Sequence, residues 1–165
     1  MSDLYQEILV KRDTPTVNKV LKAGLIAVVV LLVAASIFIS PFLMLAAVVV
    51  GALAFAFVIP KLDVEYEYLY VNGELDIDVI YSRQKRKKLG SYAVTDLEVL
   101  APANSHALDN YRKEKLMDYT SGKNTGKEYI AVYNKDKKRD VLKLELNEAI
   151  LKDMQRVAPR KINLY

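Results

Sequence analysis

The residues best placed to do chemistry are a run of basic side chains in the middle of this 165-residue chain. Guanidinium and ammonium groups can bind phosphate-bearing headgroups, and each one near an anionic leaflet contributes about 1 kcal/mol. The run therefore predicts contact with anionic lipid, with a solvated loop between two strands as the alternative. No aromatic residues interleave it, so it does not predict nucleic-acid binding. Its basic members are Arg83, Lys85, Arg86, Lys87 and Lys88.

Acidic residues recur at alternate positions just before that run. They are Glu65, Glu67, Glu74, Asp76 and Asp78. In the hairpin predicted below, Glu67 lies opposite Asp78, and like charges in that position destabilise a strand pair. We expect either an exposed face relieved by solvent and by lysines of the next strand, or a basic protein partner. A hard cation wants several oxygens at one point, and a ladder spreads them, so no metal site is predicted.

Catalytic groups are sparse. His106 is the single histidine and there is no cysteine, so a Ser-His or Cys-His pair would have to use His106, in a polar segment predicted to be a loop. The stretch from Gly122 to Lys127 is one residue too short for a phosphate-binding loop, and Glu128 stands where Ser or Thr is required. We expect no catalytic residue, no cofactor and no enzyme activity.

An uncharged apolar run of about 38 residues, 23–60, lies between Lys22 and Lys61. As one helix it would be about 57 Å long, against a hydrocarbon core of about 30 Å. Pro41 disfavours continuous helix, so we predict two spans, about 15–39 and 42–59, with a turn at 40–41. Thr14 is the expected N-cap and Pro15 the first helical residue. A re-entrant hairpin remains the alternative.

The apolar run 23–60 contains no ionisable residue, which favours an anchor over a transport pathway. Basic residues flank both ends of the hairpin, and the turn has none. By the positive-inside rule, both termini are then cytoplasmic, in the plasma (inner) membrane. The basic residues closest to the apolar run 23–60 are Lys11, Arg12, Lys19, Lys22 and Lys61.

The first thirteen residues place Leu4, Tyr5, Ile8 and Leu9 at helical spacing behind Ser2. We predict a short amphipathic helix over residues 1–13. Because so short a helix is marginal alone in water, it would dock on the membrane or on the soluble domain.

The remaining residues, 61–165, predict a domain of strands closed by a helix. The segments 64–71 and 74–81 alternate around Asn72-Gly73, a strong signal for a type I′ hairpin. Its register pairs Tyr66, Tyr68 and Tyr70 with apolar residues, so the tyrosines are expected in the core. Further strands are predicted at 87–93, 96–100, 115–119, 129–133 and 140–146, with a turn at about 134–138. A helix over 148–157, capped by Asn147, carries an apolar stripe of Ile150, Leu151, Met154 and Val157.

Seven antiparallel strands followed by a helix is the order of a pleckstrin-homology-like (PH-like) barrel. The stretch VEYEYLYVNGELDIDVIYSRQKRKKLGSYAVTDLEVLAP resembles bacterial PH-like domains that follow membrane spans, and SYAVTDLEVL is similar to their third-to-fourth strand junction. The whole chain resembles a family of small, uncharacterised bacterial membrane proteins. That resemblance implies an α+β chain, with a transmembrane helical hairpin and a PH-like antiparallel β-barrel or bent sheet of about seven strands closed by a C-terminal helix. It supplies no catalytic residues.

These observations predict three regions, 1–13, 14–60 and 61–165, and a membrane-anchored cytoplasmic interaction or scaffold module. The expected partners are the bilayer and a protein. One alternative is a sensor of anionic lipid or of the membrane surface that uses residues 83–88. Another is an accessory subunit of a membrane transporter complex.

Overall fold

The computed structural model describes residues 4–135 and 138–164, which fold as two compact units. One unit holds most of the β-structure and the C-terminal helix, and comprises Met1–Asp13, Glu65–Val79 and Arg86–Tyr165. The other, Thr14–Val64 with Ile80–Lys85, contains the apolar helices. We call them the sheet unit and the hairpin unit.

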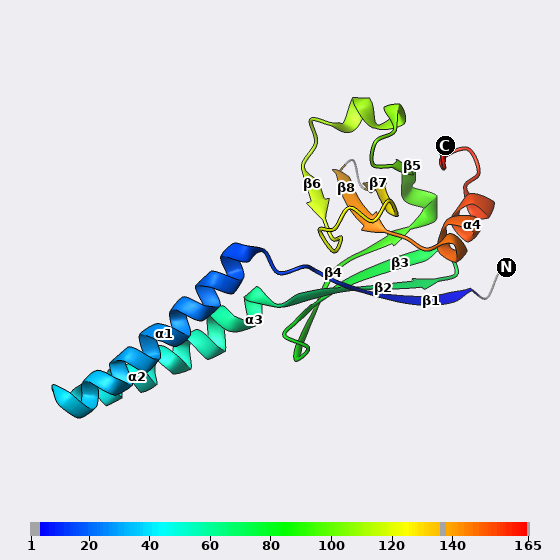
Figure 1. The fold of residues 1–165 in the computed structure, drawn as a ribbon. Coiled ribbons are helices and arrows are strands. Elements are labelled where there is room, and N and C mark those ends of the chain that lie inside the picture. The colour runs from blue at the N-terminus through cyan, green and yellow to red at the C-terminus, as the bar shows by residue number, and fades with distance from the viewer. Residues whose placement is uncertain (1–3, 136–137, 165) are drawn as a thin grey trace. The chain divides into compact units, whose positions relative to one another are not determined.

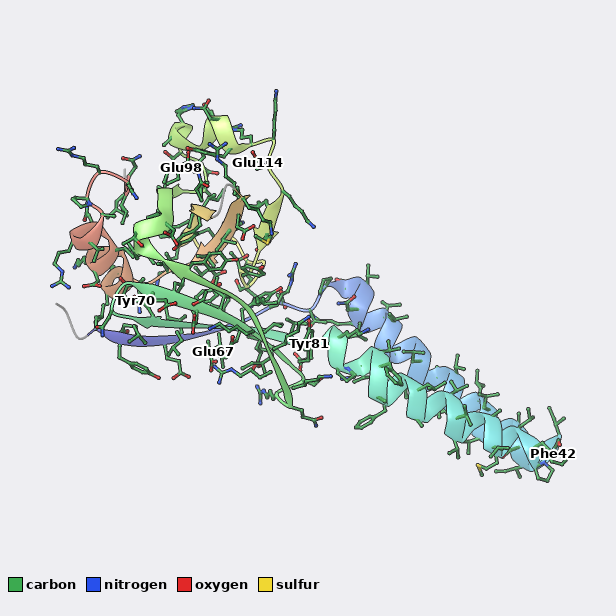
Figure 2. The ribbon with its side chains drawn as sticks, turned by 180° about the vertical axis from the view of Figure 1, so that it is seen from behind. Phe42, Glu67, Tyr70, Tyr81, Glu98 and Glu114 are labelled. Carbon is green, nitrogen blue, oxygen red and sulfur yellow. The ribbon has the colours of Figure 1, made fainter. Side chains whose placement is uncertain are left out.

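The hairpin unit contains two apolar helical segments packed along each other (Figure 1). The first is α1, Thr16–Phe38, and the second joins α2, Phe42–Leu53, to a π-helical turn η1, Ala54–Val58, and to α3, Ile59–Leu62. Both segments, of 23 and 21 residues, are long and apolar enough to cross a membrane. Their side chains project outward around both helices, as far as Phe42 near the turn (Figure 2). The predicted turn at 40–41 is confirmed.

Two details of the predicted spans are wrong. Pro15, not Thr14, is the N-cap of α1, and no side chain caps this end. The second span continues past Pro60 to Leu62 instead of ending before the proline. Proline lacks an N–H and crowds the carbonyl four residues earlier. The π-helical turn Ala54–Val58 lies directly before it and widens the backbone spacing where that carbonyl would clash.

The first sheet has four strands in the order β1-β2-β3-β4. β2 is Val64–Val71 and β3 is Glu74–Tyr81, with the bounds that alternation predicts. Asn72 and Gly73 between them have φ of 49° and 87°, as a type I′ turn requires. The other strands are β1, Tyr5–Lys11, and β4, Lys85–Ala93.

The predicted N-terminal helix is wrong, because residues 5–11 form the edge strand β1. This strand pairs antiparallel with β2, so that Ile8 lies opposite Tyr68 and Val10 opposite Tyr66. A two-turn helix has few internal hydrogen bonds, whereas pairing with β2 satisfies the backbone and buries Val10 at 6 % exposure. The β-branched residues at positions 8 and 10 fit a strand face better than a helix.

The second sheet has the order β5-β7-β8-β6, in which β6 runs parallel to β8. Its strands are β5, Leu97–Pro102, β6, Leu116–Asp118, β7, Glu128–Lys135, and β8, Lys138–Glu145. Within residues 4–135 and 138–164, the two sheets do not close into a barrel, and eight strands replace the expected seven because β1 is added. The predicted turn at 134–138 falls partly outside the described residues. Short 3₁₀ segments, η2, Val94–Asp96, and η3, His106–Tyr111, complete the loops.

The C-terminal helix α4, Glu148–Val157, has the predicted bounds. The Asn147 side chain accepts the Ile150 N–H at 2.9 Å, which satisfies a free donor of the first turn. Ile150, Leu151 and Met154 are buried, but Val157 is 47 % exposed, so the predicted stripe is one residue too long. Val157 is the last helical residue, where the chain leaves the core.

Candidate functional site

The basic run and the acidic ladder are partners of each other. Nε of Arg86 lies 2.6 Å from Oδ2 of Asp78, and its Nη2 forms an ion pair with Glu67. Nζ of Lys88 lies 2.8 Å from Oδ2 of Asp76. Basic residues of β4 thus compensate the acidic residues of β2 and β3. Relief by the next strand is one of the alternatives that the sequence left open.

Hydrogen bonds from Ser91 extend this charged network. The Ser91 hydroxyl lies 2.7 Å from Oε1 of Glu74 and also contacts Asp76. Burial alone would raise the pKa of Asp76, but hydrogen bonds from Lys88 and Ser91, with the Lys88 charge, outweigh it and lower that pKa. The Lys88 pKa is raised, chiefly by its hydrogen bond to Asp76. Both groups are therefore held in their charged forms.

The acidic residues do not all lie on an exposed face. Glu65 and Glu67 are only 5 % and 8 % exposed, contrary to the exposed face considered above. They sit on β2, an inner strand once β1 is added, with Lys11 opposite Glu65 and Leu9 opposite Glu67. Neighbours on both sides exclude water from carboxylates that an edge strand would have exposed. Figure 2 labels Glu67 among these strands.

The basic run is mostly strand, because β4 begins at Lys85 and only residues 82–84 form the turn. Ser82 and Arg83 have φ of 46° and 57°, and the Gln84 N–H donates to the Tyr81 carbonyl at 3.0 Å. Left-handed backbone at a non-glycine residue costs roughly 1 kcal/mol or more. The turn is therefore held in a conformation that its residues do not favour.

This turn belongs to the hairpin unit and is hydrogen-bonded to the end of the second apolar segment, at Pro60 and Asp63. The Ser82 N–H donates to the Asp63 carbonyl at 2.8 Å, and its hydroxyl to the Pro60 carbonyl at 3.5 Å. Arg83 and Lys85 are exposed there. Three more exposed lysines lie on helices of the same unit, Lys19 and Lys22 near the start of α1 and Lys61 on α3.

A groove that the sequence reading missed runs along β1. It has a volume of about 670 Å³ and lies entirely within the sheet unit. One wall is β1 from Glu7 to Lys11, and the other comes from the start of α4 and the ends of β7 and β8, with Tyr129, Leu146 and Leu151 among its apolar residues. The groove was missed because it exists only if residues 5–11 form a strand. The signal in the sequence was the β-branched pair Ile8 and Val10 at strand spacing.

Comparison with known families identifies the fold. Residues 2–164 match the model of the bacterial PH-like domain family DUF6106. The chain belongs to this family. No curated protein and no solved structure matches the chain. The match covers the helical hairpin as well as the sheets, so the family combines both units. PH-like domains are typically non-catalytic.

Tyr66, Tyr68 and Tyr70 are core residues, as predicted. The Tyr68 hydroxyl donates to the Tyr119 carbonyl at 2.5 Å, and the Tyr70 hydroxyl to Oδ2 of Asp153 at 2.9 Å. Burial raises the pKa of both phenols. Tyr92 packs on Tyr133 with ring centroids 4.9 Å apart, and burial raises the pKa of Tyr92 to about 12. Their rings fill the interior and present no stacking platform to solvent.

His106 lies on η3 with its side chain 96 % exposed and Nδ1 3.3 Å from Oδ2 of Asp109. The same Asp109 carboxylate forms an ordinary surface ion pair with Arg112, whose Nη2 lies 2.8 Å from Oδ1. Within the described part of the chain, no group of three or more acidic or histidine side chains is placed to hold a metal ion.

Proposed function

We propose that this protein is a membrane-anchored interaction module whose PH-like domain binds a protein at the cytoplasmic face, without catalytic activity. The observation that carries the proposal is the groove beside the edge strand β1. An edge strand presents unpaired backbone groups, and a groove beside it offers side-chain contacts. An apolar hairpin in the same chain would hold that surface at the bilayer.

The proposed orientation rests on charge. Basic residues flank the open end of the hairpin, and the turn at 40–41 has none, which favours cytoplasmic termini. Single cysteines at Ser40 and at the exposed Lys123 test it in intact cells, since the chain has no cysteine of its own. Labelling from outside at position 40 alone supports the orientation. Labelling at position 123 from outside contradicts it.

The interaction role is tested by photo-crosslinking in native membranes. A photoreactive residue is placed in turn at Leu9 on β1, at Lys113 in the turn after η3 and at Lys152 on α4, all exposed positions of the sheet unit. A partner should give an adduct of one defined mass from at least one position and none from an unfolded control. Absence of protein adducts from every position would count against an interaction module of any kind.

A second function, contact with anionic lipid, is favoured by the turn at residues 82–84. Ser82 is hydrogen-bonded to Pro60 and Asp63, so Arg83 and Lys85 belong to the same unit as the end of the second span. Arg83 and Lys85 are both exposed, and we expect these two residues of the hairpin unit to make most of the lipid contact.

Quenching of a fluorophore at Gln84→Cys tests the lipid contact in the full chain in bilayers. Spin-labelled anionic lipid should quench more strongly than spin-labelled zwitterionic lipid. The excess should fall with salt, since the Debye length shortens from about 10 Å at 0.1 M to about 3 Å at 1 M. It should also vanish in Arg83→Glu/Lys85→Glu. Equal quenching by both lipids would refute the contact.

A further inference from the structure

The outer edge of β1 carries unpaired backbone groups at every second residue. The Asn72 N–H donates to the Leu4 carbonyl at 3.3 Å, and the β1–β2 register pairs Tyr5 with Val71, which makes Leu4 and Asn72 the next pair. In an antiparallel ladder, hydrogen-bonded and non-hydrogen-bonded pairs alternate. Residues 6, 8 and 10 therefore bond to β2, while the N–H and C=O groups of Glu7, Leu9 and Lys11 point away from it.

This free edge forms one wall of the groove. The Asp13 N–H, next in the outward series, already donates to the Ser121 carbonyl at 2.7 Å and closes the groove at that end. The other end lies at Asn147, whose side chain donates to Gln6 at 3.3 Å. A strand bound between these ends would hydrogen-bond to Glu7, Leu9 and Lys11 and would place alternate side chains against Leu146, Leu151 and Tyr129.

The groove is charged in opposite senses at its two ends. Glu148 follows Asn147 and lines the groove, so Glu7 and Glu148 belong to the acidic end. The other end of the groove is where Ser121 lies, and the Ser121 N–H donates to Glu145 at 2.8 Å. Glu145 is paired across the sheet with Glu128, the residue after Lys127. That chain of contacts assigns Lys127 to the same end as Lys11. Glu145 also lies there, with one oxygen engaged by both the N–H and the hydroxyl of Ser121.

We propose that this groove binds one extended segment of a partner protein as an added antiparallel strand. Its acidic residue lies opposite Lys11, an apolar residue opposite Leu9, and a basic residue opposite Glu7. The residues between these positions are apolar and enter the groove. The added strand runs antiparallel to β1, because antiparallel strand pairs are more stable per residue than parallel ones. The charge gradient then fixes the order along the segment as acidic, apolar, apolar, apolar, basic. This inference rests on the proposed interaction function and names the surface and the partner chemistry.

A synthetic fluorescent peptide with the core Glu-Val-Leu-Val-Lys, flanked by Gly-Ser, tests the proposal by anisotropy on the full chain in lipid nanodiscs. The control peptide has the same core reversed, Lys-Val-Leu-Val-Glu. The forward peptide should bind at least threefold more tightly than the reversed peptide. In Glu7→Lys/Lys11→Glu the preference should invert, because cross-strand charge pairs contribute favourably when opposite and unfavourably when alike. Equal binding of the two peptides, or binding of neither up to about 1 mM, would overturn the proposal.

Leu9→Pro tests the backbone contact itself. Its N–H faces outward, so proline at this position removes a donor from the free edge without removing a bond to β2. Leu9→Ala is the matched control, since it shortens the same side chain but keeps the N–H. Peptide binding should be lost in Leu9→Pro and fall only a few fold in Leu9→Ala, while both retain the circular dichroism of the parent. If Leu9→Pro does not fold, the charge exchange alone decides, because both positions are exposed.

Two outcomes separate this proposal from the broader function. Protein adducts from Lys113 or Lys152 together with no peptide binding would refute the groove and leave the interaction module standing. A disulfide-linked dimer formed by Leu9→Cys, but not by Tyr5→Cys, would show that a second copy occupies the edge and would also refute the proposed occupant.

Discussion

Replacement of Arg86 by glutamine should lower the stability of the sheet unit by about 1–2 kcal/mol. Arg86 bridges two strands, with Nε 2.6 Å from Asp78 and its Nη2 on Glu67, a residue only 8 % exposed. Removing one partner of a fully buried pair costs about 3–5 kcal/mol, whereas an exposed pair is worth about 0–1 kcal/mol. The Arg86 side chain is 54 % exposed and that of Glu67 is 10 % exposed, so this pair is neither fully buried nor fully exposed. The expected loss of stability therefore lies between the costs for those two cases.

Thermal unfolding of the full chain in detergent micelles measures this effect. The chain has no tryptophan and 11 tyrosines, so near-ultraviolet circular dichroism reports on the tyrosine core. A loss of 1 kcal/mol shifts Tm by about 4–8 °C for a domain of about 100 residues. Lys87→Gln is the matched control, because it removes a neighbouring positive charge from an exposed residue on the alternate face of β4. It should change stability by less than about 0.5 kcal/mol.

A double-mutant cycle decides whether Arg86 acts through Asp78. Arg86→Gln, Asp78→Asn and the double variant should give a coupling energy of about 0.5 kcal/mol or more, as contacting residues do. Zero coupling would show that the contact with Asp78 contributes nothing, and equal effects of Arg86→Gln and Lys87→Gln would show the same of both ion pairs. Arg86 would then be as available for lipid as the rest of the basic run.

Gly90→Ala should cost about 1–3 kcal/mol in the same assay, because an added Cβ would lie 2.6 Å from the Tyr92 ring, which packs on Tyr133. Tyr70→Phe should cost about 1.5–3 kcal/mol, since its hydroxyl is bonded to the buried Asp153 carboxylate, and a Tm within 2 °C of the parent, on the scale of about 4–8 °C per kcal/mol, would contradict this. The raised pKa of Tyr92, about 12, contributes stability that is complete below pH 10 and is lost as pH rises through 12. Tyr92→Phe should therefore flatten the fall of stability in this range, as followed by tyrosinate absorbance. The lowered pKa of Asp76 contributes stability that is present above pH 3.8 and lost as pH falls through the lowered value, so Asp76→Asn should weaken the acid dependence of Tm.

The central hairpin could be predicted to the residue because two independent signals coincide there. Strict alternation in β2 and β3 defines the buried face, and Asn72-Gly73 fixes the register through its positive φ angles. The helix α4 was predictable for a similar reason, since a capping residue and an apolar stripe agree on its start. Local pattern was sufficient wherever the partner of a segment lies close in sequence.

The N-terminal strand could not be predicted in this way. Its partner β2 lies about 60 residues later in the chain, beyond both apolar helices. Over residues 4–9 the helical spacing of Leu4, Tyr5, Ile8 and Leu9 competes with the strand spacing of Ile8 and Val10, and only the free edge of β2 resolves the choice. The groove could not be predicted either, because one of its walls is β1 itself.

The charged residues illustrate another limit. Composition identified the acidic and basic sets, but not that Arg86 and Lys88 face the acids while Arg83 and Lys85 lie in the hairpin unit. The difference arises at one turn, where β4 begins two residues earlier than alternation suggested. A run that looked like one binding surface is therefore divided between β4, where Arg86 and Lys88 pair with carboxylates, and a turn of the hairpin unit.

The strand β1 makes the hairpin an insertion within the sheet unit rather than an N-terminal appendage. β1 ends at Lys11 and α1 begins at Thr16, while α3 ends at Leu62 and β2 begins at Val64. Because β1 and β2 are neighbours in the sheet, two adjacent strands carry the connections to the hairpin. A fragment that starts at residue 62 would lose β1, leaving Tyr66 and Tyr68 without Val10 and Ile8 and freeing the edge of β2. Such a fragment should aggregate through that edge, whereas residues 4–13 joined to residue 63 by a short Gly-Ser linker should restore a soluble, folded domain. If both fragments fold equally well, β1 is dispensable for folding, and its pairing is not what protects the edge of β2.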